Sequence, residues 1–133
     1  MATIKSYTDL SQSKKLAKIL PLESADNVIV SFGSREGAKT VVMPKETLDV
    51  IRTSFADIRE TTMCWSLAVL ISVLPRFIEF KGDKYYLRFM KEYVEYANDE
   101  VSITGRCLHT TGNNNLVDAC VEMILKLKEN KLI

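Results

Sequence analysis

The sequence lacks an excess of charge of either sign. Its 133 residues carry 18 basic and 17 acidic side chains, which gives a formal net charge of +1. A protein that gathers nucleic acid or an anionic membrane by long-range attraction normally has a clear positive excess. The balance therefore argues against nucleic acid and against membrane as partners.

Long hydrophobic runs are also missing. The longest apolar stretch runs from Leu67 to Ile71 and is extended by Val73 and Leu74. This is far short of the roughly 18 residues that a membrane-spanning helix needs. The N-terminus contains no apolar signal core. We therefore expect a cytoplasmic protein.

Cysteine and histidine are scarce. The chain has three cysteines, without a Cys-x-x-Cys pair, and one histidine. An odd cysteine number argues against a disulfide framework and fits a reducing compartment. Zinc needs about four ligands, and the nitrogen and sulfur donors are Cys64, Cys107, His109 and Cys120. Their spacing is not that of a structural site, so we expect neither a metal nor a cofactor.

The composition that remains is that of a folded globular chain. Hydrophobic residues make up 47% of the sequence and charged residues 26%, which are globular averages. A chain of this length suffices for one core but not for two independent domains of usual size. We therefore expect a single domain over residues 1–133.

Apolar periodicity predicts four helices. The first has Ser6 or Thr8 as its N-cap and ends at Pro21. The second begins at Pro44 and continues along a stripe of apolar residues. The third is apolar nearly all round and carries Trp65, and the fourth has Asn115 as its cap. The stripe of the second helix is Leu48, Ile51, Phe55 and Ile58; the third helix is Met63 to Leu74, with Thr61 or Thr62 as its cap; the fourth is Leu116 to Lys128.

Period-two alternation and β-branched residues predict strands between these helices. The first two form a hairpin and the others form an antiparallel meander. The expected strands are Val28–Phe32, Thr40–Met43, Phe77–Phe80, Tyr85–Met90, Val94–Tyr96 and Val101–Thr104. The fold class is therefore α+β: an antiparallel sheet (hairpin plus meander) packed against about four helices.

A cysteine nucleophile is one hypothesis to weigh. Cys64 near a helix start, with His109 as base, would form a nucleophilic pair. Cys64 also adjoins Trp65 in the predicted core helix, and Cys120 lies on the apolar stripe of the last helix. Free cysteines in such places behave as small hydrophobes. We therefore assign no catalytic residue.

The predicted turn from Arg106 to Asn115 is the candidate for ligand binding. Arg106, His109, Thr110 and Thr111 precede a helix, whose N-terminus attracts anions. No glycine-rich phosphate motif accompanies them, and the same residue types suit any turn from a strand to a helix. These residues stay candidates for an anion or small-ligand site.

The meander is rich in aromatic residues: Tyr85, Tyr86, Phe89, Tyr93 and Tyr96. Such residues favour strands, and their inward half fills the core. An exposed remainder would form an interface. Mixed flanking charges favour a protein over nucleic acid as its partner.

Several stretches of the sequence are familiar in combination. They are Lys5 to Leu10, Gln12 to Ala17, Ile19 to Asp26, Cys64 to Ala68, Leu74-Pro75, Leu87 to Phe89, Val117 to Ile124 and Lys126-Leu127. Together they resemble an uncharacterised family of short proteins from gut anaerobes and their mobile elements. The segments from Asn27 to Met63 and around His109 do not take part in the resemblance. It carries no activity, ligand or site, but it implies a role linked to a mobile element or phage.

The leading interpretation is a non-enzymatic accessory or protein-interaction domain. It would act through a surface contact with a protein partner or with a second copy of itself as a homo-oligomer. The alternative is a small enzyme or an anion-binding or ligand-binding protein that uses the turn at 106–115.

Overall fold

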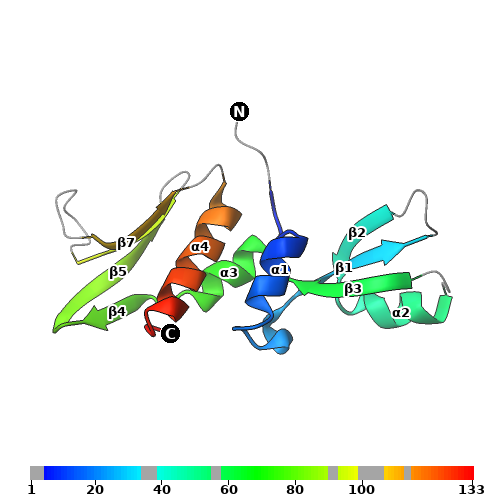
Figure 1. Cartoon of the computed structure of the whole chain (residues 1–133), viewed down its shortest axis with the longest axis horizontal. Helices are drawn as coiled ribbons and strands as arrows, with labels where there is room; N and C mark the ends of the chain where they lie inside the picture. The colour runs from blue at the N-terminus through cyan, green and yellow to red at the C-terminus, as the bar shows by residue number, and fades with distance from the viewer. Residues whose placement is uncertain (1–4, 34–38, 55–57, 90–92, 99–106, 113–114) are drawn as a thin grey trace. The chain divides into compact units, whose positions relative to one another are not determined.

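The computed structural model describes residues 5–33, 39–54, 58–89, 93–98, 107–112 and 115–133. Its contacts divide the chain into two compact units. The N-terminal unit is Tyr7–Val69, and the C-terminal unit is Leu70–Ile133 together with Met1–Ser6. Each unit contains its own antiparallel sheet (Figure 1). The α+β class predicted from the sequence is confirmed.

The N-terminal unit is built on a three-stranded sheet with the order β2-β1-β3. Both pairings are antiparallel, and the predicted hairpin of β1 and β2 is confirmed. Its elements are α1 (Leu10–Leu16), the short 3-10 helix η1 (Leu22–Ser24), β1 (Asn27–Phe32), β2 (Lys39–Pro44), α2 (Thr47–Ser54) and β3 (Ile58–Cys64). The next helix, α3 (Leu67–Val73), contains the boundary between the units.

One face of this sheet forms a small core with α2. Side chains alternate along a strand, so Val28 and Val30 of β1 share a face, and both are fully buried. Leu48 of α2 packs against them. Partly buried apolar side chains complete the cluster: Phe32, Met43, Ile58 and Met63.

The start of α1 differs from the prediction. Its N-cap is Asp9, not Ser6 or Thr8. The Asp9 carboxylate accepts a hydrogen bond from the Gln12 N–H at 2.8 Å, and the Gln12 side chain accepts one from the Asp9 N–H at 3.1 Å. This reciprocal capping box satisfies two N–H groups of the first turn. The helix ends at Leu16, well before Pro21.

The second and third predicted helices are also corrected. Pro44 is the last residue of β2, and Ile58 begins β3 instead of continuing the stripe of α2. The predicted helix from Met63 to Leu74 is wrong over its first residues, because Met63 and Cys64 belong to β3. β3 pairs with β1 along its length, and these ladder hydrogen bonds outweigh the local apolar pattern.

The C-terminal unit contains a four-stranded meander with the order β4-β5-β6-β7. All three pairings are antiparallel. Its elements are β4 (Phe77–Phe80), β5 (Asp83–Phe89), β6 (Tyr93–Ala97), β7 (Cys107–Gly112) and α4 (Leu116–Glu129). The predicted strand Val101–Thr104 lies outside the described residues.

The final helix matches its prediction closely. The Asn115 side chain caps α4 by accepting a hydrogen bond from the Asp118 N–H at 2.9 Å. The predicted stripe is buried at Cys120, Met123, Ile124 and Leu127. The helix packs on β6 and β7 (Figure 1). Among the described residues, no helix is both long and apolar enough to cross a membrane.

The meander sheet has an inner and an outer face. Alternation places Ile78, Tyr85, Val94 and Tyr96 on the inner face, where all four are buried. The Tyr96 hydroxyl donates to the Pro75 carbonyl at 2.7 Å. Burial raises the pKa of Tyr96, and nearby Cys120 of α4 raises it further. The inner face is therefore the side covered by α4.

Candidate functional site

The structure changes the setting of the predicted ligand site. Arg106 lies outside the described residues, whereas His109, Thr110 and Thr111 lie on β7. In the register of the sheet they are opposite Tyr96, Glu95 and Val94. A strand therefore replaces the predicted turn over 107–112. The N-terminus of α4 is capped by Asn115 instead.

The two described cysteines are interior groups. Cys64, the last residue of β3, and Cys120 of α4 are both free thiols with no exposed surface. Burial and the negative charge of Asp26 raise the pKa of Cys64 to about 11, and burial raises that of Cys120 to about 12. A nucleophilic cysteine needs a thiolate, so these pKa values oppose the pairing of Cys64 with His109 as catalyst.

The four donors considered for zinc lie on three elements, β3, β7 and α4. Cys107 and His109 lie on β7, and Cys120 lies on α4. Within the residues that the structure describes, no group of three or more His, Cys, Asp or Glu side chains is placed to hold a metal ion.

A buried polar network surrounds Trp65. The Trp65 backbone N–H donates to the Thr8 hydroxyl at 3.1 Å, and the Thr8 N–H donates to the Trp65 carbonyl at 3.0 Å. The Thr8 and Ser13 hydroxyls are 2.7 Å apart. The Trp65 indole N–H donates to Ser24 Oγ at 2.9 Å. These hydrogen bonds connect the N-terminal segment and η1 to the end of β3. The network therefore stabilises the fold of this unit.

Asp26 belongs to the same junction. Its carboxylate accepts a hydrogen bond from the Ser66 N–H at 2.8 Å. Burial acts to raise the pKa of Asp26, but hydrogen bonds from Ser66 and Asn27 together lower it below its usual 3.8. The carboxylate is therefore ionised at neutral pH, where it holds the start of α3.

The candidate functional site is the outer face of the meander sheet. We define it by Phe77, Lys84, Tyr86, Arg88 and Glu95, which share the face opposite to Ile78, Tyr85, Val94 and Tyr96. On this face Phe77 and Lys84 are exposed, Tyr86 and Arg88 are partly exposed, and Glu95 is buried. Phe77 and Tyr86 are direct neighbours across β4 and β5, and their ring centroids are 6.2 Å apart. Lys84 Nζ lies 4.8 Å from the centroid of the Phe77 ring. Phe77 is 43% exposed and Tyr86 is partly exposed.

An ion pair borders this aromatic pair. Arg88 is directly opposite Glu95 in the register of β5 and β6, and Arg88 Nη2 lies 2.6 Å from Glu95 Oε1. Their side chains are 24% and 12% exposed. Arg88 and Tyr86 are two residues apart on β5, so they lie on the same face of the sheet. Arginine and tyrosine are enriched among binding hot spots.

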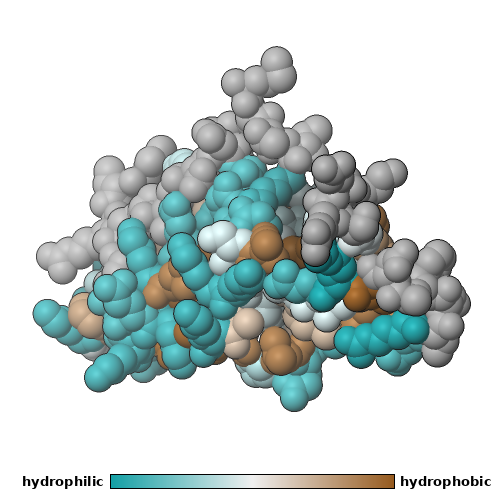
Figure 2. Space-filling model, turned by 45° about the vertical axis from the view of Figure 1, so that its right-hand side comes forward, coloured by the Kyte–Doolittle hydropathy of each residue, from teal (hydrophilic) through white to brown (hydrophobic). Residues whose placement is uncertain are grey.

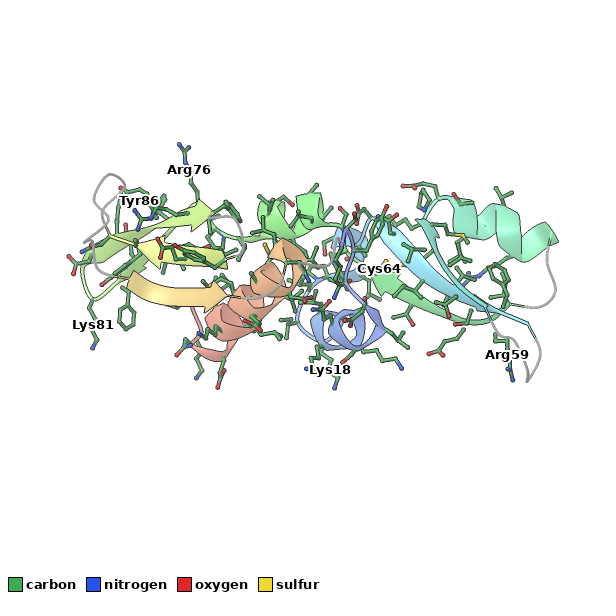
Figure 3. All side chains as sticks on the ribbon, turned by 90° about the horizontal axis from the view of Figure 1, so that it is seen from above. Lys18, Arg59, Cys64, Arg76, Lys81 and Tyr86 are labelled. Carbon is green, nitrogen blue, oxygen red and sulfur yellow. The ribbon has the colours of Figure 1, made fainter. Side chains whose placement is uncertain are left out.

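Phe80 and Lys81, at the end of β4, form a second exposed pair of an aromatic ring and a lysine. Tyr86 and Lys81 lie on different sides of the strands in Figure 3. Phe80, 36% exposed, ends β4, and Lys81 Nζ lies 5.3 Å from the centroid of its ring. On the side displayed in Figure 2, hydrophobic side chains are broken up by hydrophilic ones. Phe80, like Phe77, therefore has a lysine ammonium group close to its ring.

The sequence reasoning named the aromatic residues of the meander but missed the pairing of Arg88 with Glu95. The prediction that part of these aromatic residues faces the core is confirmed for Tyr85 and Tyr96, which are both buried. The signal for the ion pair was the opposite charge of two residues on consecutive strands. It becomes readable only when the register of β5 and β6 is known.

No protein-family model, no curated protein and no solved structure matches the chain. The resemblance described from the sequence therefore stays an expectation.

Proposed function

We propose that this chain is a non-enzymatic accessory protein that binds a protein partner through the outer face of the meander sheet. The observation that carries the proposal is the Phe77–Tyr86 pair with the Arg88–Glu95 ion pair beside it. Tyrosine, phenylalanine and arginine are enriched in protein interfaces, and hot spots are built from few such residues.

The charges of this face favour a protein over other ligands. Lys84 and Arg88 of β5 are directly opposite Glu79 of β4 and Glu95 of β6 respectively. A surface for nucleic acid needs an excess of cations along the path of the phosphates. A surface with balanced charges around aromatic rings suits a partner that carries charges of both signs.

The buried thiols support the rest of the proposal. Cys64 and Cys120 contribute packing and no thiolate, which is consistent with a role in binding. Free thiols also fit the cytoplasmic location that we propose. The link to a mobile element or phage, which rests on the resemblance alone, belongs to the same proposal.

The test compares two phenylalanines of one strand. Phe77→Ser removes the outer aromatic ring, and Phe80→Ser is the matched control, since Phe80 has similar exposure on β4 but lies at a position of opposite alternation. Each tagged variant is used to capture proteins from the native host, and the captured protein is then purified. Its affinity for each variant is measured by titration calorimetry.

We expect the purified partner to bind the parent and F80S alike. It should bind F77S at least about tenfold more weakly, as expected for a hot-spot residue. Equal binding by the parent and F77S would refute the proposed surface. Failure to recover any protein that binds the parent directly would refute the function.

A further inference from the structure

The two edges of the sheet in the N-terminal unit differ. β3, at one edge, carries Arg59 and Glu60, and its register with β1 is irregular next to Ser31. α1 also packs on β3. Charges, irregular pairing and a covering helix are the usual protections of a sheet edge against pairing with another strand. The β3 edge is therefore protected against pairing with a strand of another chain.

β2, at the other edge, begins with Lys39 and ends with Pro44, and α2 packs on it. Its middle residues Thr40, Val41, Val42 and Met43 carry no charge, and their pairing with β1 is regular. Val41 is opposite buried Val30 and Val42 is opposite buried Ile29, so the two valines lie on opposite faces of the sheet. They are nevertheless 44% and 39% exposed. An added strand at this edge would cover both.

The backbone of β2 shows which groups point outward. The Lys45 N–H donates to the Asp26 carbonyl at 3.3 Å, which continues the register of β2 with β1. Hydrogen-bonded positions alternate in an antiparallel ladder, so Val41 and Met43 also point their N–H and C=O groups toward β1. Thr40 and Val42 point theirs outward. Pro44 falls at an outward position, where its missing N–H costs the sheet nothing.

We propose that β2 pairs with β2 of a second copy of this chain, antiparallel, about a two-fold axis at Val41. The N–H and C=O groups of Thr40 in each copy then bond to those of Val42 in the other. The two Val41 side chains meet directly across the axis. Pro44, which has no N–H to donate, takes no part in these hydrogen bonds between Thr40 and Val42. The alternative register, centred on Val42, places Lys39 opposite Lys45 and Thr40 opposite Pro44, which cannot donate.

A second copy fits this edge because the edge is complementary to itself. A two-fold axis normal to the sheet keeps each face on its own side, so the α2 helices of both copies lie on the same face. α2 packs on β2, and its Val50 is 64% exposed. We expect α2 to add to the contact between the two strands. A six-residue strand and one short helix bury less than the roughly 1,200 Å² of stable interfaces, so we expect a weak dimer that depends on concentration.

This inference is independent of the proposed function, since it concerns another sheet. The first test is sedimentation of the full chain from micromolar to millimolar concentration. Val42→Pro removes the outward N–H donor but no bond to β1, and Val42→Thr keeps the donor and the β-branched shape. We expect the parent and V42T to dimerise, and the dissociation constant of V42P to be at least about tenfold higher.

Crosslinking locates the contact without relying on V42P. In Val41→Cys, the two new thiols lie on directly opposed residues at a separation that a disulfide can bridge. The controls are the parent chain and Leu22→Cys, whose site on η1 is similarly exposed at 52%. We expect mild oxidation to crosslink V41C several-fold faster than either control. A strict monomer, or a dimer in which V41C crosslinks no faster than L22C, would overturn the inference.

Discussion

The hydroxyl of Thr8 offers the sharpest test of how the N-terminal unit is held together. The side chain is 2% exposed. Its oxygen accepts the Trp65 backbone N–H at 3.1 Å and lies 2.7 Å from Ser13 Oγ. Thr8→Val keeps the shape of the side chain but removes both hydrogen bonds. Thr8→Ser keeps the hydroxyl and removes one methyl group, so it is the matched control.

The expected cost follows from the groups left without a partner. A buried donor that loses its acceptor costs about 1–3 kcal/mol. In T8V the Trp65 N–H is left without its acceptor, so this loss of stability applies to it. The Ser13 hydroxyl adds a smaller loss of stability, because a helical serine can donate to the carbonyl one turn earlier, here that of Asp9. We therefore expect T8V to lose about 2–3 kcal/mol and T8S to lose about 1 kcal/mol.

The measurement is urea denaturation followed by far-ultraviolet circular dichroism and by the fluorescence of the single tryptophan. With a slope of about 1–3 kcal/mol per molar urea, a loss of about 2–3 kcal/mol should lower the midpoint of T8V by roughly 0.7–3 M. The double variant T8V/S13A should lose less than the sum of the single losses, because the two hydroxyls interact. If T8V proves as stable as T8S, the buried network does not fasten this unit.

Further expectations concern thiols, charges and a helix cap. Cys64 and Cys120 should resist alkylation in the folded chain at neutral pH and react after unfolding. Because burial raises the pKa of both thiols, their contribution to the free energy of unfolding is fully present below about pH 9 and is lost as the pH rises toward 11–12. A C64A/C120A chain should therefore lose stability less steeply over this pH range. Glu95→Gln should cost roughly 1–2 kcal/mol in denaturation, with part regained when Arg88 is also changed to Gln. Asn115→Ala should lower the melting temperature through a loss of about 1 kcal/mol.

Local signals predicted the hairpin and the last helix well. β1 and β2 are β-branched runs separated by glycine, and both lie within one or two residues of the prediction. The last helix combines a cap at Asn115 with an apolar stripe at helical spacing. Each element therefore has a pattern that a short window contains entirely.

The errors lie where distant contacts decide. Met63 and Cys64 continue an apolar run, which alone does not separate a strand from a buried helix. Pairing with β1 assigns them to β3. Thr8 is a good helix cap in isolation, but its hydroxyl serves the Trp65 N–H, and Asp9 takes the cap. In both cases a partner far along the chain determines the local structure.

The candidate surface was only half predictable for the same reason. That Tyr85 and Tyr86 face opposite sides follows from alternation alone. Which of them faces α4 depends on the tertiary structure, which buries Tyr85 and leaves Tyr86 partly exposed. The Arg88–Glu95 pair depends on the register of two strands. Register is set by connections and by the whole sheet, so a single sequence does not reveal it.

The two proposed contacts lie on different sheets, and this makes them separable. Phe77 acts through the outer face of β4 and β5, whereas Val42 acts through the edge of β2. Because the two sites share no residue, we expect independent effects: F77S should lose the partner and keep the dimer, and V42P should lose the dimer and keep the partner. Loss of the partner by V42P as well, with the dimer retained by F77S, would mean that partner binding requires the dimer. In that case the effective unit is two copies presenting two aromatic faces, and the affinity for the partner should rise with the concentration of the chain.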